Sequence, residues 1–186
     1  MRIIAGNLKG RRLNPPQNLP VRPTTDMARE ALFNILANYI DFEDCTVLDL
    51  FAGTGAVSME FVSRGARHVT SIDISNACTD YIKAEAQRLK VTNIHVVRAD
   101  VFDLLKRVNR RFDLIFADPP YALEGLPTLP DQVFNSQALS DDGIFVLEHP
   151  RDYSFEDHPN FWQHRNYGKV NFTFFAKKLD DSEEKD

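Results

Sequence analysis

Four consecutive residues, Asp118, Pro119, Pro120 and Tyr121, carry the groups needed to position an exocyclic amine of a nucleobase. Such an amine is a poor nucleophile, since its lone pair is delocalised into the aromatic ring. The Asp118 carboxylate and the Pro119 carbonyl can accept the two amine hydrogens and orient the nitrogen towards an activated methyl group. Asp118 can also accept a proton as the nitrogen becomes cationic, and the Tyr121 ring can stack on the base. We therefore predict that these four residues are catalytic.

A glycine-containing segment, residues 49–55, here called the glycine-containing loop, lies at the end of a predicted strand and leads into a predicted helix. This is the position at which an open α/β sheet binds its ligand. Gly53 and Gly55 let the backbone approach a ligand that side chains would exclude. Ser58 stands where a dinucleotide-binding fingerprint has its third glycine, and the chain contains no GxxxxGK phosphate loop, which disfavours a nucleoside triphosphate.

Acidic residues also end the next two predicted strands. Asp73 is placed to bind the hydroxyl groups of a ribose, and Asp100, followed by Val101, is placed to meet an adenine edge. Each carboxylate taken alone could equally cap the helix that follows it. Together with Asp49 they favour a cationic adenosine cofactor over a phosphate-rich one, so we predict S-adenosylmethionine. The residues predicted to bind it from these motifs are Asp49, Phe51, Ala52, Gly53, Gly55, Asp73, Ile74, Asp100 and Val101.

Alternating strands and helices must position these motifs. The predicted strands are residues 46–51, 68–74, 94–99, 112–118 and 144–149, followed by two antiparallel strands at 162–170 and 171–177. The predicted helices between them are residues 57–63, 77–89 and 101–108. Nearly continuous apolar runs, such as residues 114–117, are typical of parallel strands covered on both faces. The fold class is therefore α/β, a doubly wound sheet built from β-α-β units.

The first 25 residues differ in charge from the rest of the chain. They contain five basic residues and no acidic one, although the whole chain has a net charge of −5. Residues 3–13 read as a small N-terminal β-hairpin, and such a basic arm on an acidic body favours a polyanionic partner over an accidentally charged surface hairpin. We predict RNA contacts for Arg2, Lys9, Arg11 and Arg12.

The predicted domain organisation is a basic hairpin and connector at residues 1–23, a methyltransferase domain at 24–178 and a disordered acidic tail at 179–186. A helix is expected to begin near residues 24–26. Its predicted apolar face consists of Met27, Ala31, Leu32, Ile35, Leu36 and Tyr39. Neither a membrane span nor a signal peptide is evident, so we expect a cytoplasmic protein. The cysteines and histidines lack metal-ligand spacing, and no metal is predicted.

The segment of residues 22–34, with the sequence RPTTDMAREALFN, resembles the RPTxDxxRExLFN segment of bacterial 16S rRNA guanine-N2 methyltransferases of the guanine-966 type. The resemblance continues through residues 2–6, 49–55 and 118–121, through Glu148, and through Tyr167 and Gly168. It implies a monomeric, Rossmann-like class I methyltransferase that acts on guanine N2 in 16S rRNA, within an assembled or assembling small subunit. By the same analogy Arg22 and Thr24 border the cofactor and target pocket, and the N-terminal hairpin contacts RNA.

Two other functions remain open at this stage. The Asp118–Tyr121 motif would serve an adenine-N6 or cytosine-N4 DNA methyltransferase equally well, although the chain shows no separate domain for reading DNA sequence. A non-catalytic RNA-binding assembly factor would have lost the aspartates, which are intact here. Glu148 could line the base pocket or face solvent, and Arg29 and Glu30 could be an ordinary pair on a solvated helix face.

Overall fold

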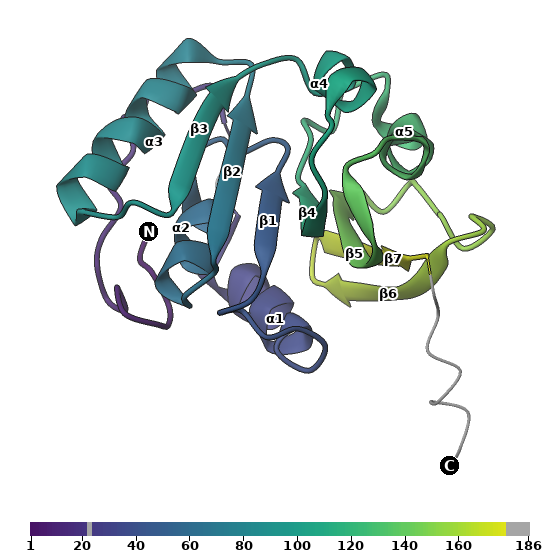
Figure 1. The fold of residues 1–186 in the computed structure, drawn as a ribbon, viewed down its shortest axis with the longest axis horizontal. Helices are drawn as coiled ribbons and strands as arrows, with labels where there is room; N and C mark the ends of the chain where they lie inside the picture. The colour runs from purple at the N-terminus through teal and green to yellow at the C-terminus, as the bar shows by residue number, and fades with distance from the viewer. Residues whose placement is uncertain (22–23, 178–186) are drawn as a thin grey trace.

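A twisted sheet of seven strands forms the centre of the protein in the computed structural model, which describes residues 1–21 and 24–177 (Figure 1). The strand order is β3-β2-β1-β4-β5-β7-β6, in which the first five strands are parallel and β7 runs antiparallel to both of its neighbours. The strands are β1 (Thr46–Asp49), β2 (His68–Asp73), β3 (Ile94–Arg98), β4 (Phe112–Ala117), β5 (Leu139–His149), β6 (Phe161–Tyr167) and β7 (Val170–Ala176). The predicted α/β class and its antiparallel closing pair are confirmed.

Helices cover both faces of the sheet. They are α1 (Asp26–Leu36), α2 (Ala56–Ser63), α3 (Asn76–Leu89), α4 (Val101–Arg107) and α5 (Leu129–Asn135), with a short 3₁₀ turn η1 (Leu126–Thr128) before α5. Successive strand residues point to opposite faces, so Val47 packs with α1 and α2, whereas Leu48 packs in the core that includes α4 and α5. Both faces of the central strands are therefore buried, as their apolar runs predict.

The predicted boundaries differ from the structure at a few places. The central strands end one or two residues earlier than predicted, which leaves Phe51, Ile74 and Asp118 in the loops beyond them. Helix α5, η1 and the first residues of β5 were not predicted, because residues 122–143 show no clear periodicity. The predicted N-terminal hairpin is present as an antiparallel bridge between Arg2 and Arg12, and the Ile3 amide donates to the Arg11 carbonyl and the Leu13 amide to the Met1 carbonyl.

The predicted apolar face of α1 is confirmed at Leu32 and Leu36, but the rest of the buried face is shifted by about one position. The structure buries Ala28, Arg29, Leu32, Phe33 and Leu36, and it leaves Met27 67% exposed. The charged residue Arg29 lies on the buried side of the helix. A prediction from hydrophobicity alone therefore selects the adjacent face instead. The helix begins where predicted, with the Thr25 side chain accepting a hydrogen bond from the Ala28 amide.

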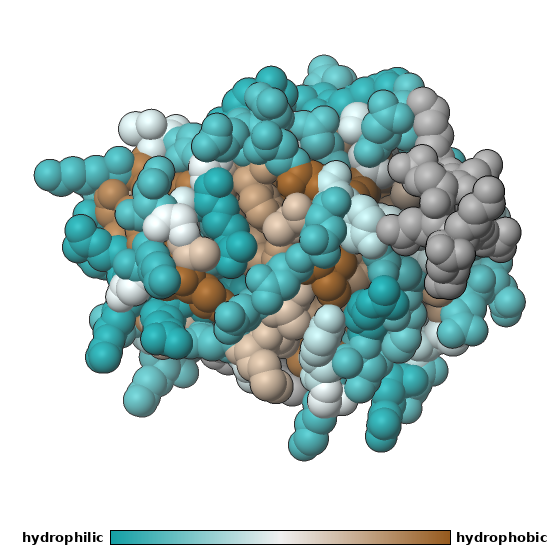
Figure 2. All heavy atoms as spheres, turned by 90° about the horizontal axis from the view of Figure 1, so that it is seen from below, coloured by the Kyte–Doolittle hydropathy of each residue, from teal (hydrophilic) through white to brown (hydrophobic). Residues whose placement is uncertain are grey.

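The carboxyl ends of β1, β2 and β3 point upward in Figure 1 and lie at one edge of the sheet. On the side seen from below, apolar residues reach the surface in a central band between hydrophilic side chains (Figure 2). Within the described residues no helix combines the length and the apolar character of a membrane span. The predicted disordered tail lies outside the described residues, and the proposed domain boundaries stay predictions.

Candidate active site

A cavity of about 630 Å³ opens at the carboxyl ends of the parallel strands. This volume lies within the range of roughly 300–1,000 Å³ found for small-molecule and cofactor sites. Of the residues predicted to be catalytic or to bind cofactor, those that line the cavity are Thr24, Asp49, Phe51, Ala52, Gly53, Asp73, Ile74, Asp100, Val101, Asp118, Pro119, Pro120 and Tyr121. The structure thus brings the glycine-containing loop and the Asp118–Tyr121 motif into one cavity. Gly55 lies outside its lining, and Arg22 falls outside the described residues.

The two glycines of the loop have different tasks. Gly53 has φ +54° and lines the cavity, so its bare backbone leaves room for a ligand. Gly55 has φ +76° and precedes α2, where a Cβ atom would come within 2.8 Å of Ile82 Cγ1. The structure therefore explains Gly55 by helix packing rather than by contact with a cofactor.

Asp73 is held in place by the backbone around it. Its Oδ2 accepts a hydrogen bond from the Gly53 amide and its Oδ1 accepts one from the Ser75 amide, both at 2.8 Å. Each carboxylate oxygen can accept a further hydrogen bond, so both oxygens retain acceptor capacity for ribose hydroxyls. Beside it, the Ile74 side chain is 64% exposed at the cavity, an apolar surface suited to an adenine ring.

The structure confirms that Asp100 caps a helix, and its predicted contact with an adenine edge stays a prediction. Its Oδ1 caps α4 by accepting a hydrogen bond from the Asp103 amide at 3.0 Å. The residue also lines the cavity, next to Val101 and Phe102. Asp100 therefore caps α4 and can also contact a ligand in the cavity.

Asp49 carries the cavity's most buried carboxylate and is only 1% exposed. Ser58 Oγ donates to Asp49 Oδ2 at 2.6 Å, and Ser71 Oγ donates to Ser58 Oγ at 2.6 Å. Asp49 Oδ1 is buried, and the backbone amide of Phe51 lies close enough to the carboxylate to favour its ionised form. Burial raises the pKa of Asp49 to about 7, Ser58 opposes the rise, and the nearby charges of Asp118 and Asp73 add to it. A buried carboxylate in the cavity lining, whose ionised form a nearby positive charge would stabilise, fits a cationic cofactor such as S-adenosylmethionine.

We expect cofactor binding to release protons below neutral pH. A sulfonium cation favours the ionised form of Asp49, so an Asp49 carboxyl that is protonated at pH 6 must lose its proton on binding. The release should approach about one proton per cofactor at pH 6 and fall to near zero at pH 8.5, with affinity decreasing as the pH falls. Calorimetry in two buffers of different ionisation enthalpy measures this number. Equal release at both pH values, or release that persists in Asp49→Asn, would contradict the assignment.

The Asp118–Tyr121 motif leaves β4 directly into the cavity. Asp118 Oδ2 accepts a hydrogen bond from the Thr24 hydroxyl at 3.3 Å, which ties the segment before α1 to the end of β4. After buried Pro119 the chain turns, with the Leu123 amide donating to the Pro120 carbonyl at 2.9 Å. Two prolines fix the backbone at this exit, so the position of the Asp118 carboxylate is largely set before any ligand binds.

Several residues of the site were not assigned to it from the sequence. Phe102 and Leu123 form apolar walls of the cavity, and Glu148 lines it while only 5% exposed. Of the two alternatives for Glu148, the structure supports a place in the pocket. The hydrogen bonds from Ser71 to Ser58 and on to Asp49 depend on the packing of α2 against β2, and no local pattern reveals them.

The N-terminal arm, residues 1–13, packs against α2 and α3 rather than extending from the body. Ile3 and Leu13 are buried against Met59 and Ile82. Of the residues predicted to contact RNA, Lys9, Arg11 and Arg12 are exposed. The exposed Arg2 side chain lies 3.7 Å from the Asp26 carboxylate (Nε to Oδ2).

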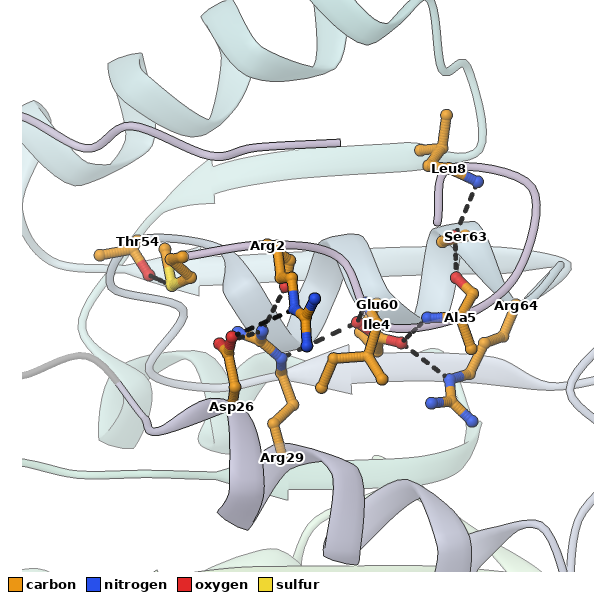
Figure 3. A network of polar contacts seen from close by, with 11 residues as sticks. Arg2, Ile4, Ala5, Leu8, Asp26, Arg29, Thr54, Glu60, Ser63 and Arg64 are labelled. Carbon is orange, nitrogen blue, oxygen red and sulfur yellow. Dashed lines mark hydrogen bonds and ion pairs between the residues drawn. The ribbon is translucent and has the colours of Figure 1, made fainter. Parts of the chain in front are cut away.

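A buried cluster of charges anchors this arm (Figure 3). Glu60 of α2 accepts hydrogen bonds from the amides of Ile4 and Ala5 at 2.9 and 3.0 Å and from Arg64 Nε at 3.0 Å. Arg29 of α1 points into the same cluster, where it donates to the Arg2 carbonyl and to Asp26 Oδ1. Arg29 is fully buried, so the alternative of a solvated surface pair is wrong for it, whereas Glu30 is exposed. Burial lowers the pKa of Arg29, and Glu60 and Asp26 oppose the shift.

Fold and site together define a Rossmann-like class I methyltransferase. The solved structure "Putative methyltransferase yhhF from Escherichia coli" superposes with a TM-score of 0.84 at 28% identity, covering 97% of this chain and 99% of that one. A 16S rRNA N2 methyltransferase of T. thermophilus (RsmC), in complex with AdoMet and guanosine, shares the fold with a TM-score of 0.67 at 21% identity, over 83% of this chain and 44% of that one. Among the described residues no group of three or more histidines, cysteines and carboxylates could hold a metal.

The chain belongs to the family described as "Conserved hypothetical protein 95", which matches residues 1–176. A relative in Escherichia coli (strain K12), "Ribosomal RNA small subunit methyltransferase D", is 31% identical over 181 residues, which are 96% of this chain and 90% of the relative. The family suggested by the RPTxDxxRExLFN segment is confirmed.

Proposed function

We propose that this protein transfers a methyl group from S-adenosylmethionine to the exocyclic N2 amine of a guanine in 16S rRNA of the small ribosomal subunit. The observation that carries the proposal is that Asp118 and the glycine-containing loop line one cavity of about 630 Å³. One part of the cavity suits an adenosine cofactor and the other suits a flat base with an amino group. The relatives named as small-subunit rRNA methyltransferases support the choice of substrate.

When bound, the cofactor supplies an electrophilic methyl group that needs no further activation. The residues of the chain then have to orient and deprotonate the amine. Asp118 and the Pro119 carbonyl accept the amine hydrogens, which aligns the nitrogen for attack. Tyr121 lines the cavity and provides a ring against which an extruded base can stack. Asp118 accepts the proton that the methylated nitrogen releases.

The proposal is tested by offering labelled S-adenosylmethionine with unmodified small subunits, with naked 16S rRNA and with DNA. Digestion to nucleosides and mass spectrometry identify the methylated base and its acceptor. We expect N2-methylguanosine from one or both RNA substrates and no label in DNA. Label in DNA as methylated adenine or cytosine would support the alternative function. Absence of label from every substrate would support the non-catalytic assembly factor.

The exposed basic residues of the N-terminal arm are proposed to contact the rRNA backbone. Replacing Lys9, Arg11 and Arg12 together by Gln should weaken RNA binding and reduce the slope of log K against log salt by about 2–3, since each lost phosphate contact removes roughly 0.7–0.9 from the slope. Binding is measured by filter retention at several salt concentrations.

A matched control replaces one lysine and two arginines elsewhere on the surface, Lys169, Arg151 and Arg165, all of which are exposed. An equal change of slope in both triple variants would mean that net charge, rather than the arm, governs RNA binding. The monomeric state and the cytoplasmic location stay predictions, and sedimentation of the purified protein tests the first of them.

A further inference from the structure

Glu148 stands beside the catalytic motif at the same edge of the sheet. Strands β4 and β5 are parallel neighbours, and Ala117 pairs with Leu147, so Asp118 and Glu148 both follow the last residues of this pairing. Both residues line the cavity. The sheet thus sets two carboxylates side by side where the target base must enter.

The end of β5 is firmly held, which fixes the position of Glu148. On its other side β5 pairs with β7, with Glu148 opposite Phe172. The next residue, His149, is buried on the opposite face, where its ring nitrogens lie 2.9 Å from the Pro150 carbonyl and 2.7 Å from Thr173 Oγ1. Glu148 itself is only 5% exposed. A buried carboxylate on so rigid a strand end is suited to recognise a ligand rather than to solvate a surface.

Guanine presents hydrogen-bond donors to this pair of carboxylates. Its N2 amine lies next to the N1–H group, so the base edge carries adjacent donors. Adenine N1 and cytosine N3, which neighbour the exocyclic amines of those bases, are lone pairs that a carboxylate repels. No Lys, Arg or His of the described residues lines the cavity, so none of these residues supplies a cationic donor to such a lone pair.

We propose that Glu148 selects guanine by accepting a hydrogen bond from N1–H while Asp118 and Pro119 hold the N2 amine. This inference rests on the proposed function, since it assumes that guanine N2 is the acceptor. In this scheme Glu148 of β5 determines which base is methylated, and Asp118 and Pro119, which follow β4, position the amine for methyl transfer. A site built to accept a hydrogen bond from an N–H group discriminates strongly against an analogue that presents a lone pair there, because the carboxylate and the lone pair repel each other.

The test uses rRNA in which the target guanine is replaced by 2-aminopurine, which keeps the 2-amine but has a lone pair at N1. For the wild-type enzyme we expect kcat/KM for guanine to exceed that for 2-aminopurine by about 100-fold or more. In Glu148→Gln the ratio should fall below about 10, because an amide can rotate to donate to the N1 lone pair. The matched control Glu156→Gln removes an exposed carboxylate and should leave the ratio unchanged.

Equal wild-type rates on guanine and 2-aminopurine would overturn the inference without any variant, so it stays testable even if Glu148→Gln does not fold. An unchanged ratio in folded Glu148→Gln, with cofactor affinity retained by calorimetry, would overturn it as well. In both cases methylation of guanine N2 by the wild-type enzyme would leave the proposed function intact. Absence of guanine methylation by the wild-type enzyme would overturn the proposed function and this inference together.

Discussion

Replacing Asp118 by Ala is expected to lower kcat by about 10³-fold or more while the affinity for S-adenosylmethionine changes less than about threefold. The variant loses the acceptor that orients the amine and the group that accepts its proton, whereas Asp49, Asp73 and the glycine-containing loop remain in place. Single-turnover methyl transfer and calorimetry measure the two quantities. Asp152→Ala removes an exposed aspartate and serves as the control. Full activity of Asp118→Ala would remove Asp118 from the mechanism.

Asp118→Asn separates the two roles of the carboxylate. The amide oxygen still accepts a hydrogen bond from the amine, but an amide is too weak a base to take up the proton. If orientation dominates, Asn should retain most of the activity that Ala loses. If proton acceptance dominates, Asn and Ala should be equally inactive, and the loss should be relieved at higher pH. The Thr24 hydroxyl can continue to donate to the side-chain oxygen in the Asn variant.

The sequence predicts the central sheet well because its local signals and its tertiary environment agree. Residues 114–117 are apolar without interruption, and the structure buries every one of them. The glycine-containing loop and the Asp118–Tyr121 motif follow strands whose parallel arrangement is nearly fixed by the β-α-β pattern, so their meeting in one cavity could be foreseen. The prediction fails in residues 122–143, where α5 and the start of β5 acquire their structure from packing against the sheet.

The individual tasks of the site residues are harder to foresee than its location. Gly55 looks like a ligand-binding glycine in sequence, yet the side chain of Ile82 in α3 accounts for it. The acidity of Asp49 depends on burial and on Ser58, which is brought to it by α2. Arg29 reads as a surface residue because charged side chains are almost never fully buried without partners. Asp26, three residues earlier, is a local partner, but the Arg2 carbonyl and Glu60 come from the arm and from α2, far away in sequence, so no local pattern identifies the buried cluster.

The buried charges around Glu60 connect the stability of the fold with the proposed RNA contacts. Glu60 accepts two backbone amides of the arm and is fully buried together with Arg29, whose Nε lies 3.8 Å from Glu60 Oε2. Removing one partner of a buried ion pair leaves an uncompensated charge, and this usually costs more than the pair contributes. We therefore expect substitutions in this cluster to destabilise the arm that carries Lys9, Arg11 and Arg12.

We expect Glu60→Gln to lower the free energy of unfolding by about 3–5 kcal/mol. The Gln amide removes the buried countercharge of Arg29, which keeps the partly exposed Asp26 as its ion-pair partner, and the Gln NH₂ group faces donors from Ile4, Ala5 or Arg64 where an acceptor is required. Urea denaturation measures the loss, and faster hydrogen exchange at the Ile4 and Ala5 amides should show that the arm has loosened.

The control makes the same change in a partly exposed ion pair. Glu85 lies 2.6 Å from Arg88, and their side chains are 13% and 49% exposed, so Glu85→Gln should cost less, about 1 kcal/mol. A similar decrease in the free energy of unfolding in the two variants would mean that Glu60 stabilises the protein no more than a partly exposed ion pair does. If Glu60→Gln is the costlier change and also weakens RNA binding by the folded protein, then the cluster orders the basic arm for its substrate. Unchanged RNA binding in that variant would separate the anchoring of the arm from its proposed function.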